Sequence, residues 1–376
     1  MSPYSRGGVE EALVEETLRL CRIASVTGDE AACAAYVEAE LSRTPYRVER
    51  VGETVLASSP GADDRPLVLL VGHTDTVPPK PGDPAPSVEG DRVVGLGASD
   101  MKSGLAVMLE LARRLDPHAL PFRVGFVFYD KEEGPWAISG LGPTLESVGW
   151  LHHAVLAFCL EPSDNVVQVG CLGSLHARVT ILGKAAHSAR PWQGENAVHA
   201  AGRLLVALGE RAPRDVLLHG HLYREVLSAT LIGGGRTRNV IPDRCELNLN
   251  FRFAPGRSIE DAEEEVRGVV RAAVKGEHEI EFAERAPSGR VIGDNPHLSL
   301  FLAINGNPVH AKQAWTDVAR LGQVGIDAVN LGPGESAQAH QARESTAIPL
   351  IVESYRQFER FLREGGPVRA RQTLTS

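Results

Sequence analysis

Hydrophobic and polar residues follow one another along the first part of the chain in two alternating patterns. Short, almost continuous apolar runs at 66–72, 122–129 and 154–160 have the length and composition of buried strands. Between them, residues 9–41 and 100–115 carry apolar side chains at helical spacing. Strands that alternate with helices predict an α/β domain with a mostly parallel sheet and helices on both faces.

The pattern changes after Gly173. "SLHARVTILGKAAHSA" (174–189) and "CELNLNFRFAP" (245–255) alternate apolar with polar residues, as half-exposed antiparallel strands do, and helical segments follow at 196–208 and 258–274. From about residue 295 the α/β pattern returns. We therefore predict a larger domain of residues 1–172 plus 290–376, interrupted by a smaller α+β domain of residues 173–289.

Composition narrows the class of protein. A formal net charge of −9 without a basic stripe argues against a nucleic-acid or anionic-membrane partner. The five cysteines are scattered and form no CxxC pair, which fits a reducing compartment. The N-terminal residues lack the apolar core of a signal peptide, and no apolar run reaches the roughly 20 residues that span a bilayer. We expect a soluble, cytoplasmic protein.

Groups that can bind a metal follow directly after the predicted strands. His73 and Asp75 follow the first, Glu132 and Glu133 the second, and Glu161 the third. In open α/β sheets the carboxyl ends of the strands share one edge, so we expect these groups to converge there. Asp100, at a predicted helix start, and His340, after a Gly-rich loop, would join them. Imidazoles and carboxylates together form sites for first-row divalent metals, zinc above all.

Each of these signals has an ordinary structural explanation when taken alone. A histidine at a strand end is more often structural than a ligand, and Asp100 alone is better explained as a helix N-cap. "GLGASD" (95–100) resembles a dinucleotide-binding loop, but Asp100 stands where the third glycine belongs. The pair Glu132–Glu133 alone would be a solvated surface pair. The metal site is favoured because all these groups fall at the same end of predicted strands.

Five motifs carry a resemblance to a known family. "GHTDTVP", "GLGASDMKSG", "DKEEGPWAISG", "EPSDN" and "GKAAHSARPWQGENAVH" resemble those of the co-catalytic zinc amidohydrolases and metallopeptidases. That family includes aminoacylases, acetylornithine deacetylases and succinyl-diaminopimelate desuccinylases. The matching motifs span most of the chain in the expected order. "GCLGSLHA", "HSARPWQGEN" and "WTDVARLGQVGIDAVNLGPG" are most similar to the desuccinylase branch.

The resemblance implies a role for each polar residue. It implies two zinc ions bridged by Asp100, one completed by His73 and Glu161 and the other by Glu133 and His340. The ligand types alone do not separate zinc from cobalt or manganese. Asp75 would accept the second ring N–H of His73 and fix its tautomer. Glu132 would be the general base. Two metals that share a water next to a carboxylate are chemically suited to amide hydrolysis.

The smaller domain supplies further residues by resemblance. His187 matches a lid histidine that donates to the tetrahedral oxyanion, and in relatives the same lid forms the homodimer; a polar strand-end residue is the equal alternative. Arg252 matches the position that binds the succinyl carboxylate, although a cross-strand ion pair explains it as well. Asn239, Thr316 and Arg320 match other substrate contacts. Cys171 and Leu172 depart from the family, because many relatives carry a basic residue there.

These inferences predict hydrolysis of N-succinyl-L,L-diaminopimelate to succinate and L,L-diaminopimelate, by a catalytic domain interrupted by a dimerising lid. Another small N-acyl amino acid or peptide substrate is the first alternative, as in acetylornithine deacetylases, aminoacylases or dipeptidases. A metal-binding relative without catalysis is the second, and the intact Glu132 argues against it. A serine hydrolase is disfavoured because the sequence contains no GxSxG motif.

Overall fold

A computed structural model describes residues 8–61 and 63–365 and divides the chain into two compact units. Of the described residues, the first comprises 8–61, 63–169, 292–310 and 320–365, and the second comprises 170–291 and 311–319. The predicted division at 172/173 and 289/290 lies within three residues of these junctions. The second unit also takes in residues 311–319, which the pattern of apolar residues does not separate from the larger domain.

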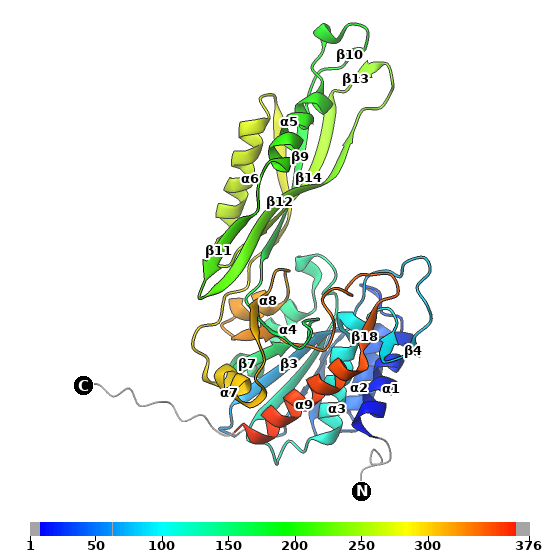
Figure 1. The fold of residues 1–376 in the computed structure, drawn as a ribbon, viewed down its shortest axis with the longest axis vertical. Coiled ribbons are helices and arrows are strands. Elements are labelled where there is room, and N and C mark those ends of the chain that lie inside the picture. Colours follow the sequence, from blue (N-terminus) through cyan, green and yellow to red (C-terminus); the bar gives the residue numbers. More distant parts are fainter. Residues whose placement is uncertain (1–7, 62, 366–376) are drawn as a thin grey trace, which may run out of the picture. The chain divides into compact units, whose positions relative to one another are not determined.

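The first unit is built on an eight-stranded mixed sheet with the strand order β1-β2-β6-β3-β7-β17-β8-β16 (Figure 1). Its central strands β6, β3, β7 and β17 run parallel, whereas β1, β2 and β8 pair antiparallel. A separate three-stranded sheet contains β18, β5 and β4. The strands are β1 (Arg47–Val51), β2 (Thr54–Ser58), β3 (Leu67–His73), β4 (Ser87–Glu89), β5 (Arg92–Val94), β6 (Arg123–Tyr129), β7 (Ala154–Cys159), β8 (Val167–Val169), β16 (Val309–Ala311), β17 (Ala328–Asn330) and β18 (Ser345–Ala347).

Helices cover both faces of this sheet. On one face Phe158 of β7 packs against Phe301 of α7 and Phe358 of α9, and α3 lies so close that a Cβ at Gly72 would meet the Leu105 side chain at 2.7 Å. On the other face the Trp150 ring of η3 packs against Gly125. The helices are α1 (Val9–Arg22), α2 (Ala31–Leu41), α3 (Ser103–Arg114), α4 (Leu141–Ser147), α7 (Pro296–Asn305), α8 (Val318–Gln323) and α9 (Ile348–Glu364), with short turns η1 (Ala98–Lys102), η2 (Trp136–Ile138) and η3 (Gly149–His153).

The second unit is a five-stranded antiparallel sheet, β11-β12-β14-β9-β15, with two helices on one face (Figure 1). Alternate residues of β14, such as Leu247, Leu249 and Phe251, are buried beneath these helices, while the residues between them lie on the open face. The elements are β9 (Gly173–Leu182), β10 (Ala186–His187), η4 (Pro191–Gln193), α5 (Ala197–Gly209), β11 (Arg214–Leu218), β12 (His221–Gly234), β13 (Val240–Ile241), β14 (Arg244–Phe253), α6 (Ile259–Ala273) and β15 (His278–Ala286). The predicted fold class is confirmed by this arrangement.

Across residues 8–61 and 63–365, no helix combines the length and the apolar character that a bilayer span requires.

Candidate active site

The candidate site lies at the carboxyl end of the central parallel strands of the first unit. His73 is the last residue of β3 and stands beside Tyr129, the last residue of β6. The Tyr129 carbonyl accepts a hydrogen bond from the Thr74 backbone N–H at 2.8 Å. The loop that follows β6 carries Glu132 and Glu133 and therefore begins next to His73, as the strand-end argument requires.

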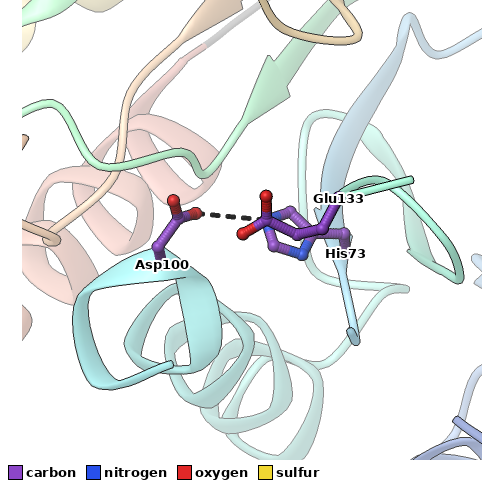
Figure 2. A group of neighbouring side chains, drawn as sticks. All are labelled: His73, Asp100 and Glu133. Carbon is purple, nitrogen blue, oxygen red and sulfur yellow. Dashed lines mark hydrogen bonds and ion pairs between the residues drawn. The ribbon is translucent and has the colours of Figure 1, made fainter. Parts of the chain in front are cut away.

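Four side chains in this region form a cluster of donor atoms. His73, Asp100 and Glu133 each offer an atom within 4.8 Å of the other two (Figure 2). His73 Nε2 lies 3.1 Å from Asp100 Oδ1, whereas His340 Nε2 lies 3.5 Å from Asp100 Oδ2 and 2.8 Å from Glu133 Oε1. The two oxygens of Asp100 thus face different histidines. A carboxylate in this position is placed to bridge two cations.

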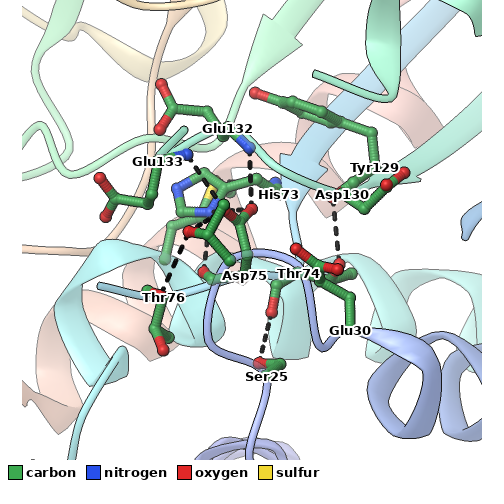
Figure 3. A network of polar contacts seen from close by, with 12 residues as sticks. Ser25, Glu30, His73, Thr74, Asp75, Thr76, Tyr129, Asp130, Glu132 and Glu133 are labelled. Carbon is green, nitrogen blue, oxygen red and sulfur yellow. Dashed lines mark hydrogen bonds and ion pairs between the residues drawn. The ribbon is translucent and has the colours of Figure 1, made fainter. Parts of the chain in front are cut away.

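Asp75 fixes the loop that carries the two glutamates. Its carboxylate is fully buried; Oδ1 accepts the Glu132 backbone N–H at 2.9 Å, and Oδ2 accepts the Glu133 backbone N–H at 3.0 Å and the Thr27 hydroxyl at 2.9 Å (Figure 3). His73 Nδ1 lies 3.0 Å from the Asp75 main-chain oxygen and 3.5 Å from Oδ1. Asp75 therefore contacts the ring that the sequence paired it with and also holds the neighbouring loop.

Carboxylates dominate the electrostatics around His73. Burial by itself would lower the pKa of His73, but hydrogen bonds with Asp100 and Asp75 and the charges of Glu132 and Glu161 raise it well above its ordinary value. Glu161 follows β7 by two residues and is buried. The hydrogen bond with Glu133 likewise raises the pKa of His340. Such a site attracts positive charge.

The charges and hydrogen bonds around His73 also determine whether the Asp75 carboxyl group is ionised. Burial opposes its charge, but the hydrogen bond and charge of His73, together with the two backbone N–H groups, lower the pKa of Asp75 below its ordinary value. Asp75 therefore stays ionised at neutral pH.

The donor set fits a divalent metal. Neutral imidazole nitrogens and carboxylate oxygens are the ligands that zinc and its neighbours prefer, and a cation can replace the protons that the crowded carboxylates otherwise hold on the histidines. His73, Asp100, Glu133 and His340 could hold such ions together, and Glu161 lies close enough to act on the His73 charge.

Glu344 is a site residue that the sequence argument missed. Its buried carboxylate accepts backbone N–H groups from Gly97 at 3.1 Å and from Ser99 and Asp100 at 2.8 Å each. Burial raises the pKa of Glu344 to about 7, against the opposing effect of these hydrogen bonds. Glu344 ties the turn that carries Asp100 to the loop that carries His340. The sequence feature that could have indicated Glu344 as a site residue is its position four residues after His340.

The remaining predicted residues are spread over the chain. His187 is the exposed last residue of β10, where its Nδ1 accepts the Ala189 backbone N–H, and the carbonyl of Asn239 accepts the Ser188 backbone N–H. Arg252 lies on the open face of the second unit. The cross-strand ion pair, which was the alternative explanation for Arg252, is absent among the described residues; the polar contact of its side chain there is with Asn250 at 3.1 Å.

Thr316 and Arg320 lie close in sequence but in different units. Thr316 belongs to the second unit, where its main-chain oxygen contacts the Cys171 Sγ at 3.5 Å. Arg320 belongs to the first, where its guanidinium lies 3.5 Å from the centroid of the Trp136 ring and donates to the Trp136 carbonyl at 2.7 Å. Trp136 therefore already engages the Arg320 side chain.

Comparison with known families and relatives identifies the class of protein. Residues 169–278 match the model of the peptidase dimerisation domain, and residues 54–177 match that of peptidase family M28. A Mycobacterium tuberculosis protein that bears the desuccinylase name DapE is 38% identical over 354 residues, which cover 93% of this chain and 97% of that protein. The succinyl-diaminopimelate desuccinylase of Corynebacterium glutamicum is 35% identical over 358 residues, covering 93% and 95%.

Solved structures share the fold at lower identity. Aminopeptidase PepT from Bacillus cereus aligns with a TM-score of 0.77 at 21% identity, covering 95% of this chain and 99% of its own. The YXEP protein of Bacillus subtilis, described as a dinuclear metal binding peptidase of family M20, aligns with a TM-score of 0.71 at 18% identity, covering 95% and 98%.

Together, the relatives, the fold and the donor set define a metal-dependent amidohydrolase. The chain belongs to the amidohydrolase and metallopeptidase family that contains the succinyl-diaminopimelate desuccinylases.

Proposed function

We propose that this chain hydrolyses N-succinyl-L,L-diaminopimelate to succinate and L,L-diaminopimelate, a reaction of lysine and diaminopimelate biosynthesis in the cytoplasm. The observation that carries the proposal is the identity of 35% to 38% over almost the whole length of two relatives that bear this name. The intact donor cluster and the neighbouring Glu132 support an active enzyme rather than a non-catalytic relative.

The proposed resident metals are two zinc ions bridged by Asp100. His73 and Glu161 would complete one ion, and Glu133 and His340 the other. The contacts of the two Asp100 oxygens with different histidines, at 3.1 and 3.5 Å, support this division. When bound, the ions would lower the pKa of a water and polarise the scissile carbonyl.

The chain's own residues would then carry the proton and hold the reacting groups. Glu132, whose backbone is fixed by Asp75, takes a proton from the attacking water and delivers it to the nitrogen that leaves. The deprotonated water adds to the acyl carbon and gives a tetrahedral oxyanion. Its collapse breaks the C–N bond as the nitrogen takes the proton from Glu132, and succinate and a free amine result. We assign His187 as a donor to the tetrahedral oxyanion. Asp75 orients the His73 ring.

Arg252 is the proposed partner of the succinyl carboxylate. It lines a pocket of about 440 Å³ within the second unit, together with the side chains of Leu172, Leu222 and Val226. Arg224, which is paired with Asp215, and Gln313 also line this pocket. Apolar walls beside the Arg252 guanidinium suit a short methylene chain that ends in a carboxylate. Leu172, one of the two residues that depart from the family pattern, forms part of this apolar wall. Asn239, Thr316 and Arg320 remain proposed substrate contacts.

A homodimer formed by the second unit is part of the proposal. The match to the dimerisation-domain model supports it, as does the β12 edge: β11 pairs only with residues 221–225, so the outer edge of residues 226–234 has no strand partner among the described residues. Leu231 and Ile232 on this segment are 71% and 53% exposed. Sedimentation analysis of the wild type and of Leu231→Arg tests this assembly: the wild type should be a dimer and the variant a monomer.

A substrate panel tests the proposed specificity. Zinc-loaded protein is offered N-succinyl-L,L-diaminopimelate, N-acetylornithine, an N-acetyl amino acid and a dipeptide at equal concentrations, and kcat/KM is measured for each. The proposal predicts that the succinyl substrate is preferred by at least tenfold. Preference for another member of the panel would keep the amidohydrolase chemistry and refute the assigned acyl group.

A further inference from the structure

The orientation of Arg252 is set by a chain of polar contacts on the open face of the second unit. Arg252 Nε donates to Asn250 Oδ1 at 3.1 Å, and Asn250 Nδ2 lies 2.8 Å from His176 Nε2. His176 of β9 is paired with Asn250 of β14 on one side and with Glu284 of β15 on the other. All these side chains lie on the face opposite α5 and α6.

Arg252 is the uncompensated cation of its pocket. Arg224, the other arginine that lines it, makes two hydrogen bonds to Asp215, at 2.7 and 3.1 Å. Gln313 uses both ends of its amide on the main chain, at Leu222 and Arg224. Within residues 8–61 and 63–365, no carboxylate lies within ion-pair distance of Arg252. Burial lowers the pKa of its guanidinium, although Glu284 opposes this effect. An arginine desolvated in this way favours an anionic ligand.

The bond to Asn250 determines which edge of Arg252 is available. The guanidinium is planar and has five N–H groups in a fixed arrangement, so a bond at Nε fixes its plane and leaves the Nη1–Nη2 edge for a ligand. A carboxylate that meets this edge can make two parallel hydrogen bonds. Without Asn250 the side chain would be free to rotate about its terminal bonds.

Hydrogen-bond chemistry also fixes the roles of Asn250 and His176. A guanidinium only donates, so Asn250 must present its oxygen to Arg252 and its NH₂ group to His176. His176 Nε2 must therefore accept, which requires the neutral imidazole with its proton on Nδ1. Nδ1 lies 3.2 Å from the Asn248 amide, whose oxygen can accept that proton once the amide is turned. Glu284 Oε2 lies 3.9 Å from the same His176 Nε2, beyond hydrogen-bond distance, so the Asn250 amide at 2.8 Å is the nearer partner of this nitrogen.

We propose that Asn250 and His176 are positioning residues that hold the Arg252 guanidinium for end-on recognition of a carboxylate at the end of a short acyl chain. The inference rests on the proposed function in one respect, namely that Arg252 binds the substrate's acyl carboxylate. His176 acts by supplying an acceptor to Asn250, and Asn250 by supplying an acceptor to Arg252. Neither residue is assigned contact with the substrate.

Kinetics on two substrates test this assignment. The variants Asn250→Leu, His176→Leu and His176→Gln are compared with the wild type on N-succinyl-L,L-diaminopimelate and on an N-acetyl amino acid. Asn250→Leu and His176→Leu should raise KM for the succinyl substrate roughly tenfold with kcat changed less than twofold, so that the succinyl-to-acetyl ratio of kcat/KM falls roughly tenfold. His176→Gln restores an acceptor and should recover most of this ratio.

Arg178→Gln is the matched control. Arg178 lies on the same face of β9, two residues beyond His176, and forms an exposed ion pair with Glu281 at 3.3 Å. Its loss should leave the kinetics unchanged. If the Leu variants keep the wild-type ratio, or if His176→Gln fails to rescue, the positioning role is refuted while the proposed function stands.

If the wild type proves to have another substrate, succinate binding tests the positioning role of Asn250 separately from the proposed desuccinylase reaction. Calorimetry with the zinc-loaded protein should show succinate binding weakened roughly tenfold by Asn250→Leu, with Arg252→Leu as the reference for complete loss of the contact. This pattern would support the positioning role even if the assigned reaction failed. Equal affinity in wild type and Asn250→Leu, or no binding by either, would overturn it.

Discussion

Replacement of Asp75 by asparagine should destabilise the protein and displace the residues of the site at the same time. The wild-type carboxylate satisfies two backbone N–H groups and one hydroxyl inside the fold. An amide has one oxygen. If the substituted side chain keeps its oxygen toward Glu132, its NH₂ group can donate to Thr27 but leaves the Glu133 backbone N–H without an acceptor. The opposite orientation leaves the Glu132 N–H unpaired.

The size of the effect follows from these contacts. An unpaired buried N–H costs roughly 1–3 kcal/mol, and the surviving hydrogen bond loses the assistance of a charge. We expect Asp75→Asn to lower the free energy of unfolding by about 3 kcal/mol. Because the freed backbone carries Glu132 and Glu133, we also expect turnover of the zinc-loaded enzyme to fall at least tenfold.

Urea unfolding at pH 8, after a chelator has removed the metal, measures the free energy of unfolding without a contribution from bound metal. Asp116→Asn is the control, because Asp116 is exposed and its side chain accepts one backbone hydrogen bond, from His118; it should change stability by less than about 0.5 kcal/mol.

The folded chain lowers the pKa of Asp75, so its charge stabilises the fold fully above the unfolded pKa of about 4, and this stabilisation is lost as the pH falls through the folded value.

The difference in the free energy of unfolding between wild type and Asp75→Asn should therefore become smaller as the pH drops below about 4. A variant as stable as the wild type at pH 8 would refute the reasoning. So would a loss of stability that does not depend on pH.

Three further predictions concern other parts of the first unit. Glu132→Gln should retain two zinc ions per chain, measured by atomic emission, while kcat falls roughly 10²- to 10⁴-fold; loss of metal would remove Glu132 from the base role. Glu344→Gln should weaken zinc binding roughly 10- to 100-fold in competition with a chelating dye, because one backbone N–H of the Asp100 turn loses its acceptor, and zinc affinity equal to wild type would contradict this. Arg113→Met should destabilise the fold by roughly 3–5 kcal/mol in urea at pH 8, since Arg113 pairs with three buried glutamates that link α1, α2 and α3; a change below about 1 kcal/mol would show that these glutamates do not need it.

Much of the fold could be predicted because its central strands are short, continuous apolar runs in the sequence. The apolar run 66–72 became β3 (Leu67–His73), and the run 122–129 became β6 (Arg123–Tyr129). The Ser258 side chain caps α6 by accepting the Asp261 backbone N–H at 3.0 Å. Parallel strands of this length bury both faces, so their sequences are continuously apolar and easy to recognise.

The part of the site that follows from strand ends could be predicted from the apolar pattern of the chain. His73 and the loop after β6 lie together because parallel strands end at one edge. Asp100 was expected at a helix start, but it lies in the separate turn η1, before α3 begins at Ser103. That turn is fixed by Glu344, which is distant in sequence, and such a tertiary contact leaves no periodic signal.

The open face of the second unit shows the same limit. The alternation in "ELNLNFRF" predicts that Asn248, Asn250 and Arg252 share one face of β14. The placement of His176 next to Asn250 depends on the register between β14 and β9, which apolar alternation does not determine. The role of Asn250 follows only once its neighbours are known.

The measurement that tests the central claim most directly is the rate of N-succinyl-L,L-diaminopimelate hydrolysis as zinc is returned to chelated protein. The account predicts no turnover without metal and a rise that saturates at two zinc ions per chain, in line with the two histidines that face the two oxygens of Asp100. Full activity after chelation would contradict it. So would two bound zinc ions without hydrolysis of this substrate.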